Sequence, residues 1–274
     1  MRFGGPVFLD LFSPAAFVGQ LKAAGYSAAG WPNVPEDAVD ETVRALADGD
    51  IVIAEVGAWS NPMDRDPEKR RAAVDTCKQR LALAERVGAR SCVNIVGSKG
   101  AFWHGPCPVD LTGETFDEIV AVTREIVDAV QPERTAYCLE TMPWLFPDSA
   151  DAYVRLIQAI DRPGFAVHLD PVNLVHSPRR YFENAALIRE CFAKLGPHIR
   201  SCHAKDIAMS TKLTVHLDEV PIGQGALDYE TYLAELAKLD PDTPLMMEHM
   251  RQDEYPAAAA HVRKTAQRMG VTIR

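Results

Sequence analysis

The sequence predicts a (β/α)8 TIM barrel, an α/β fold with eight parallel strands, as a single domain over residues 1–274. Short apolar runs alternate with segments of helical period along the whole chain, and eight such pairs can be counted. No linker-like or low-complexity stretch interrupts them. This alternation favours a parallel sheet with right-handed crossovers, and α/β barrels of this length are commonly one domain. An open doubly wound sheet is the alternative, because periodicity does not show whether a sheet closes.

Eight short apolar runs are the expected strands. They are RFGGPVFL from Arg2, YSAAGW from Tyr26, IVIAEVG from Ile51, SCVNIVG from Ser91, AYCLETMP from Ala136, FAVHLD from Phe165, IRSCHAKD from Ile199 and PLMMEHM from Pro244. In a parallel barrel the carboxyl ends of all strands meet at one mouth, where active sites gather. Polar residues that end these runs are therefore the first candidates for chemistry.

The segments between the runs carry the boundary signals of helices. The third helix is the clearest, because Asp66-Pro67 begins it, Gly88 ends it and apolar residues recur along one face between them. An acid or serine before a first-turn proline, and glycine just past the end, are typical of helix ends. The first helix begins in the same way at Ser13-Pro14. Later helices are expected at Phe116 to Val130, Ala150 to Ile160, Tyr181 to Leu195, Tyr229 to Leu239 and Tyr255 to Met269.

Composition and charge argue against several classes of protein. The chain is 47% hydrophobic with a net charge of −9, and it lacks the basic surface with which nucleic-acid-binding proteins replace phosphate counterions. No apolar run approaches the ~20 residues of a membrane span. The N-terminus shows no long apolar stretch or cleavage site, so we expect no signal peptide.

The six cysteines form no CxxC pair. Four of them, Cys92, Cys138, Cys191 and Cys202, lie in apolar strand or helix patterns, where a small buried hydrophobic residue is the usual interpretation. This pattern is typical of free cysteines in a reducing cytoplasm, and it argues against disulfide bonds and against a zinc finger.

Four acidic or histidine residues end four successive expected strands. Glu140, Asp170, His203 and Glu248 end the fifth to eighth strands, which are neighbours in a barrel. Three carboxylates brought together in this way repel one another unless a cation neutralises them. Three oxygen donors and one imidazole suit a divalent ion, for which Mn²⁺ is our first choice and Mg²⁺, Co²⁺, Zn²⁺ and Fe²⁺ are alternatives. Taken singly, each acid could be a helix cap or ion-pair partner, and His203 could be a hydrogen-bonded core residue.

Several long connections carry aromatic residues to the same end of the barrel. Trp59 follows the third expected strand, Trp103 lies after the fourth and Trp144 after the fifth. Loop elaboration at this end commonly builds a binding site. The rings suit stacking against a sugar, although ordinary packing of the loops is equally consistent with their positions.

The segments LETMPW, HLDPVN, CHAKD, VPIGQGALDY and MEHM resemble the signature segments of the xylose isomerase-like TIM barrels. That superfamily includes sugar-phosphate isomerases and epimerases, ketose 3-epimerases, inosose dehydratases and isomerases, and endonuclease IV. The resemblance implies that Glu140, Asp170, His203 and Glu248 are metal ligands. It also implies that Glu140 and Glu248 are the catalytic acid/base pair, as in the ketose epimerases.

The chain departs from the family pattern at Asn173, where epimerases and endonuclease IV commonly carry histidine. In the nuclease that histidine binds a further zinc, so Asn173 weakens a multi-zinc interpretation. His216 lies where the family often places a polar contact or extra ligand, and a plain surface histidine is the alternative. The full set of expected substrate contacts is Trp59, Asn94, Trp103, His104, Trp144, Asn173, Lys205, Asp206, His216 and Arg251.

The expected function is that of a divalent-metal-dependent sugar isomerase or epimerase. One glutamate would remove the proton next to a carbonyl, and the other would return it after passage through a metal-stabilised enediolate. A lyase or dehydratase acting on a keto-sugar, inosose or 3-keto-glycoside shares that enolising step and is the main alternative. An endonuclease IV-like repair enzyme and a non-catalytic sugar-binding barrel are more remote. The expected partner is a small carbohydrate rather than nucleic acid or membrane, and a homo-oligomer is left open.

Overall fold

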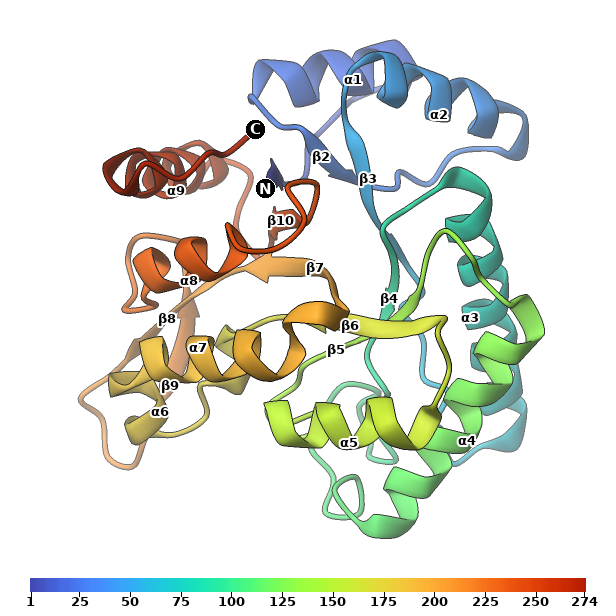
Figure 1. Ribbon diagram of the computed structural model, residues 1–274. Helices are drawn as coiled ribbons and strands as arrows, with labels where there is room; N and C mark the ends of the chain where they lie inside the picture. The colour runs from blue at the N-terminus through green and yellow to red at the C-terminus, as the bar shows by residue number, and fades with distance from the viewer.

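Eight parallel strands close into a barrel that is surrounded by helices (Figure 1), as the sequence predicts. The computed structural model describes residues 1–274. Around the barrel the strand order is β1-β10-β7-β6-β5-β4-β3-β2. The barrel strands are β1 (Arg2–Gly4), β2 (Ala28–Gly30), β3 (Val52–Gly57), β4 (Ser91–Asn94), β5 (Tyr137–Glu140), β6 (Phe165–Leu169), β7 (Ile199–Ala204) and β10 (Pro244–Met247).

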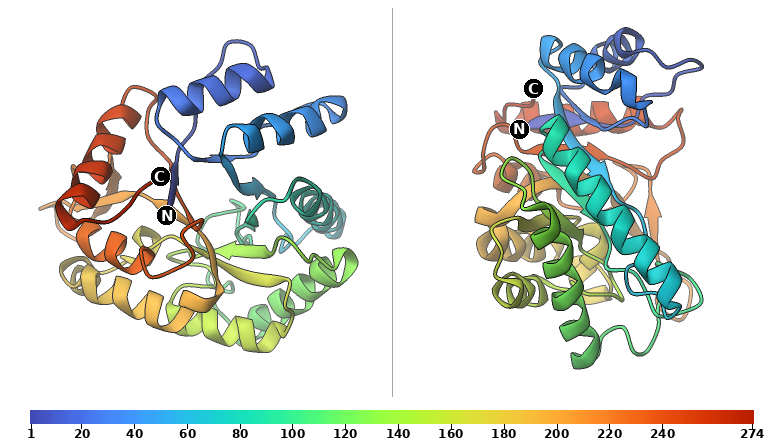
Figure 2. Two further views of the ribbon diagram at one scale, coloured as in Figure 1. Left: turned by 45° about the horizontal axis from the view of Figure 1, so that its top comes forward. Right: turned by 90° about the vertical axis from the view of Figure 1, so that its right-hand side faces the viewer.

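The helices form a ring outside the strands (Figure 2), and their ends follow the sequence signals. Ser13 accepts a hydrogen bond from the N–H of Ala16, Asp66 accepts one from Glu68, and Gly88 ends its helix with a positive φ of 72°. The helices are α1 (Pro14–Ala23), α2 (Val39–Asp48), α3 (Pro67–Val87), α4 (Gly113–Val130), α5 (Ala150–Ile160), α6 (Pro178–Phe182), α7 (Asn184–Leu195), α8 (Tyr229–Leu236) and α9 (Tyr255–Met269). None of them is both long and apolar enough to cross a membrane.

Two features differ from the sequence prediction. The helix expected from Tyr181 to Leu195 is wrong as one element, because the chain leaves helical geometry at Glu183 (φ −111°, ψ 26°) between α6 and α7. The long connection after β7 contains an antiparallel hairpin that the sequence did not predict. Its strands are β8 (Asp206–Met209) and β9 (Leu217–Val220). Each has four residues, too short for an alternating pattern to stand out.

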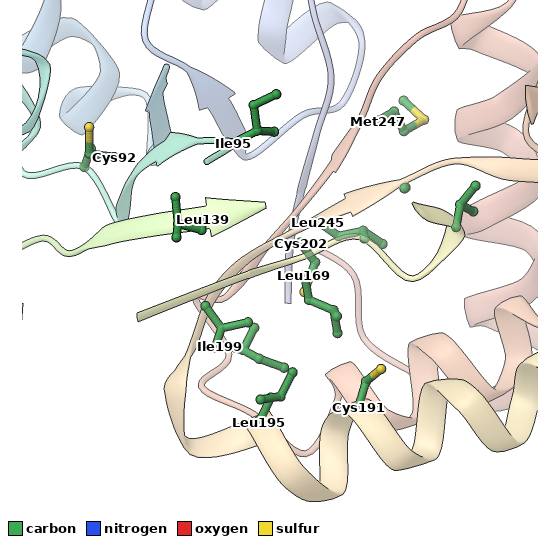
Figure 3. Packing of buried hydrophobic residues seen from close by; sticks show 14 of the residues in the cluster. Cys92, Ile95, Leu139, Leu169, Cys191, Leu195, Ile199, Cys202, Leu245 and Met247 are labelled. Carbon is green, nitrogen blue, oxygen red and sulfur yellow. The ribbon is translucent and has the colours of Figure 1, made fainter. Parts of the chain in front are cut away.

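A continuous apolar core fills the space between the barrel wall and the helices. Figure 3 shows a part of it, in which Cys191 and Leu195 point from α7 toward Leu169 and Ile199 of the wall. The four cysteines expected to be buried are all fully buried, so this expectation is confirmed. Burial raises the pKa of the Cys202 thiol to about 12, which keeps it protonated and unreactive.

Helix α5 is fixed to the barrel by one buried hydroxyl. The Tyr153 oxygen lies 2.6 Å from the carbonyl oxygen of Leu139 and 2.8 Å from that of Ala166, and it accepts a hydrogen bond from the Leu139 N–H at 3.2 Å. Leu139 belongs to β5, the strand that ends in Glu140. Tyr153 therefore ties α5 to two strands directly below the mouth.

We predict that Tyr153→Phe lowers the free energy of unfolding by about 1–3 kcal/mol, because it leaves buried backbone groups without a partner. Chemical denaturation of the wild type and the variant measures this loss. Tyr181→Phe is the control, since that hydroxyl makes no hydrogen bond within the chain, and we expect it to change stability by less than about 0.5 kcal/mol. Equal stability of the two variants would contradict the proposed tie.

Candidate metal centre and active site

The four residues that end neighbouring strands lie together at the carboxyl end of the barrel. Glu140 ends β5, Asp170 directly follows β6, His203 lies in β7 and Glu248 directly follows β10. Parallel register brings these positions to one rim, since Met246 is paired with His203 across the β10–β7 ladder. One possible ligand atom from each residue lies within 4.8 Å of those of the other three.

The donor atoms of this cluster fit a divalent cation. The Asp170 Oδ1 accepts hydrogen bonds from the backbone N–H groups of Val172 and Asn173, whereas its buried Oδ2 accepts none. The buried Oε1 of Glu248 also accepts no hydrogen bond, although it lies 2.8 Å from the Nδ1 of His203. Both oxygens share the Lys205 Nζ, at 2.9 Å and 2.7 Å, and buried carboxylates are costly unless cations compensate them. Glu140, Asp170, His203 and Glu248 could therefore hold a metal, and Glu55, His168 and His203 form a second group of possible ligands.

Lys205 supplies a part of that compensation. It lies two residues after His203, so strand alternation points both side chains into the barrel. Its Nζ lies 2.7 Å from the Glu248 Oε1 and 2.9 Å from the Asp170 Oδ2, and the residue is only 2% exposed. Burial opposes its charge, but Asp170, Glu140 and Glu248 outweigh burial and hold the pKa of Lys205 well above its usual value.

The two glutamates lie in different electrostatic surroundings. Burial raises the pKa of Glu140, whose Oε1 accepts a hydrogen bond from the Asn173 side chain at 3.1 Å. Burial also opposes ionisation of Glu248, but the nearby His203 and Lys205 outweigh it and hold the pKa of Glu248 well below its usual value. Asn173 also donates to the backbone oxygen of Thr141 at 3.0 Å, so it fixes Glu140 relative to its own strand.

One further acidic residue, Glu55, faces the Nε2 of His203, whereas Glu140 and Glu248 face its Nδ1. Glu55 of β3 places its Oε2 3.4 Å from the His203 Nε2 and 3.9 Å from the Nδ1 of His168. His168 is completely buried and its Nδ1 contacts the Ser201 hydroxyl, which makes it a core histidine. An acid behind a metal-ligating histidine orients its ring and sets its tautomer. Glu55 was not among the residues predicted from the sequence, where its only signal was one acid inside an apolar run.

Next to the centre, a cavity of about 550 Å³ opens at the mouth. Six of the expected substrate contacts line it, and they are Trp59, Trp103, His104, Trp144, Asn173 and Lys205. The Trp144 Nε1 donates to the backbone oxygen of His104 at 2.8 Å, so the loops after β4 and β5 support each other. A second, smaller cavity of about 330 Å³ has a more apolar lining and lies on the side of the mouth toward β1 and β2. Glu55 and Glu248 line both cavities.

The other four expected contacts, Asn94, Asp206, His216 and Arg251, line neither of these cavities. Asn94 is buried and exchanges hydrogen bonds with the backbone of Ser60, His216 is exposed ahead of β9, and Arg251 is exposed. The Arg251 guanidinium is 3.3 Å from the Asp253 Oδ1 and 2.9 Å from the Glu254 Oε1.

Two further residues at the mouth were missing from the expected set. Glu219 lies on β9 and places its Oε2 3.2 Å from the Nδ1 of His249. His249 follows Glu248 with a positive φ of 58°, an uncommon conformation for a residue other than glycine. Both line the larger cavity. The histidine was visible beside Glu248 in the sequence, but no pattern indicated that the hairpin would bring Glu219 to it.

Asp206 acts as the anchor of this hairpin. Its two carboxylate oxygens accept hydrogen bonds from the N–H groups of Ile207, Gly223, Gly225 and Leu227, at 2.9 to 3.0 Å. A β-carbon on Gly225 would lie 2.2 Å from the Asp206 Oδ1, so this position needs glycine. The buried carboxylate therefore organises the loop that carries Glu219.

We predict that Asp206→Ala lowers the free energy of unfolding by about 3 kcal/mol or more, because several N–H groups lose a charged acceptor. Amide hydrogen exchange should become faster at Gly223, Gly225 and Leu227. Asp218→Ala, on the exposed side of the same hairpin, is the control and should change stability by less than about 0.5 kcal/mol. A stable Asp206→Ala variant that loses only substrate affinity would instead support a direct substrate contact.

Comparison with known families matches the chain to the xylose isomerase-like TIM barrel model over residues 18–267. No curated protein sequence matches the chain. Solved structures that share its fold include the following three. A xylose isomerase-like TIM barrel protein from Mycobacterium smegmatis, in complex with magnesium, is 18% identical with a TM-score of 0.67, over 92% of this chain and 87% of that one.

The second structure is the probable 3-DHS dehydratase AsbF from Bacillus anthracis, 17% identical with a TM-score of 0.69, over 93% of this chain and 94% of that one. The third is D-psicose 3-epimerase with D-tagatose from Clostridium cellulolyticum H10, 14% identical with a TM-score of 0.71, over 97% and 99%. Identities this low are evidence of a shared fold, whereas the family match spans nearly the whole sequence. The chain belongs to the xylose isomerase-like TIM barrel family.

Proposed function

We propose that the protein is a divalent-metal-dependent sugar isomerase or epimerase that moves a proton on the carbon next to a carbonyl group. One observation carries this proposal. Glu140 and Glu248 place their Oε1 atoms 3.2 Å and 2.8 Å from the same nitrogen of His203, and both line the cavity at the mouth. Two carboxylates that reach one point beside a cavity suit a reaction in which one removes a proton and the other returns it.

The metal would be held by Glu140, Asp170, His203 and Glu248, and this donor set suits Mn²⁺. When bound, such an ion supplies Lewis-acid polarisation of a carbonyl and its neighbouring hydroxyl. Asn173 holds Glu140 in position, and Glu55 holds the ring of His203. The protein residues thus provide both the proton-transfer groups and their alignment.

The walls of the cavity suit a carbohydrate. Trp59, Trp103 and Trp144 line it, and they are 46%, 37% and 40% exposed. Large aromatic faces that remain exposed at a mouth can cover the apolar face of a sugar ring while their polar edges keep a hydrogen-bond partner. The ketose epimerase among the similar structures, solved with D-tagatose, is consistent with this substrate class.

The test is solvent deuterium exchange into a panel of ketoses and keto-cyclitols, followed by mass spectrometry, with metal-free protein and with added Mn²⁺. We expect exchange only with metal, and we expect Glu248→Gln to lower its rate by about 10²-fold or more, the usual contribution of a proton-transfer group. Metal content of the variant is measured in parallel, which separates loss of the ion from loss of the base. Glu190→Gln, on the outer face of α7, should leave the rate unchanged.

Two results would contradict the proposal. One is the absence of metal-dependent exchange on every compound, and the other is a Glu248→Gln rate equal to that of the wild type. Products that have lost water or another leaving group would show elimination in place of isomerisation.

A further inference from the structure

The mouth of the barrel is rich in carboxylates and poor in cations. Among the 14 residues that line the larger cavity, four are glutamates, two are histidines, one is a lysine and none is an arginine. The glutamates are Glu55, Glu140, Glu219 and Glu248. The smaller cavity is lined by Glu55 and Glu248 again and by no lysine or arginine. A substrate that enters either space therefore meets mainly negative charge.

The one lysine is already engaged by the acidic groups around it. The Lys205 Nζ has the Glu248 Oε1 at 2.7 Å and the Asp170 Oδ2 at 2.9 Å, and the side chain is almost completely buried. Arg251, which the sequence predicted as a substrate contact, is exposed and paired with Asp253 and Glu254. No free cationic side chain is left to receive an anionic group.

A bound metal does not reverse this balance. Glu55, Glu140, Asp170, Glu219 and Glu248 carry five negative charges when ionised, of which Lys205 offsets one, a divalent ion two and His249, when protonated, one. One negative charge then remains around the cavity. An anion placed there would lose its hydration without gaining a counter-charge, which is strongly unfavourable.

Glu219 also lines the larger cavity, but it is not one of the four proposed metal ligands. It lies on the β8–β9 hairpin outside the barrel sheet, on the opposite side of the strand from Asp218, as alternation requires. Its Oε2 lies 3.2 Å from the His249 Nδ1 and 4.0 Å from the Lys205 Nζ. The hairpin is anchored beneath it by Asp206, so the carboxylate is held over the entrance.

We infer that Glu219 is a specificity-determining residue, and that the site takes an uncharged hydroxy ketone and rejects phosphate esters and carboxylic acids. This inference rests on the proposed function, because it names the substrate class of that same site. A neutral polyhydroxylated ketone can donate hydroxyl hydrogen bonds to the carboxylates at no electrostatic cost. A phosphate dianion meets repulsion from the same groups.

The experiment compares a free ketohexose with its 6-phosphate, which carries a dianionic group at a carbon remote from the reacting carbonyl. Binding is measured by quenching of tryptophan fluorescence in the Mn²⁺-loaded protein, since three tryptophans line the cavity, and turnover by deuterium exchange. We expect the wild type to prefer the free sugar by about 100-fold in binding. Glu219→Gln should reduce this preference by about tenfold and Glu219→Lys by more, because a charge at contact distance contributes strongly in a partly buried site.

Asp218→Asn is the matched control, because it removes one charge from the same strand without lining either cavity, and its preference should equal that of the wild type. Tighter binding of the phosphate by the wild type would overturn the inference. An unchanged preference in both Glu219 variants would overturn the role of Glu219. Preferential binding of the free sugar without any exchange would uphold the charge selectivity and contradict the proposed function instead, so the two failures are distinct.

Discussion

Glu140, Asp170 and Glu248 bring three mutually repelling carboxylates together at the rim of the barrel, and the surrounding structure must hold them there. Two like charges about 4 Å apart cost roughly 4 kcal/mol at an effective dielectric constant of about 20. Glu140, Asp170 and Glu248 form three such pairs within a space of 4.8 Å. Lys205 relieves a part of this repulsion, and a divalent ion held by Glu140, Asp170, His203 and Glu248 would relieve more of it.

The strands of the barrel wall and the loops at its mouth have different roles around this cluster. The wall sets the rim positions through parallel register, and buried groups such as Tyr153 keep the strands below the rim in place. The loops then supply what differs between members of such a fold, which here is an aromatic wall and an acidic hairpin. We therefore place stability mostly below the mouth, and the proposed specificity in Glu219 and the tryptophans that line the cavity.

The sequence was sufficient to predict the barrel fold and the meeting of Glu140, Asp170, His203 and Glu248 at its rim, because both follow from short-range patterns. Apolar runs and helix caps show where strands and helices lie, and strand ends in a closed parallel sheet must meet. Glu219 was not predictable in this way, because its position depends on a hairpin of two four-residue strands and on a buried anchor. Asp206 was interpreted as a substrate contact, since a strand-end acid that binds backbone N–H groups has the same local pattern as one that faces a ligand. Arg251 was also interpreted as a substrate contact, and in the structure its exposed guanidinium is paired with Asp253 and Glu254, which follow it closely in the sequence.

The most direct measurement of the central claim is an anomalous-scattering map from crystals of the protein soaked in Mn²⁺. We predict one strong peak within about 2.5 Å of carboxylate oxygens of Glu140, Asp170 and Glu248 and of a ring nitrogen of His203. The peak should be absent from crystals of Asp170→Ala grown and soaked in the same way. A map without a peak at this cluster, or with the ion bound elsewhere, would contradict the claim that these four residues form a metal centre.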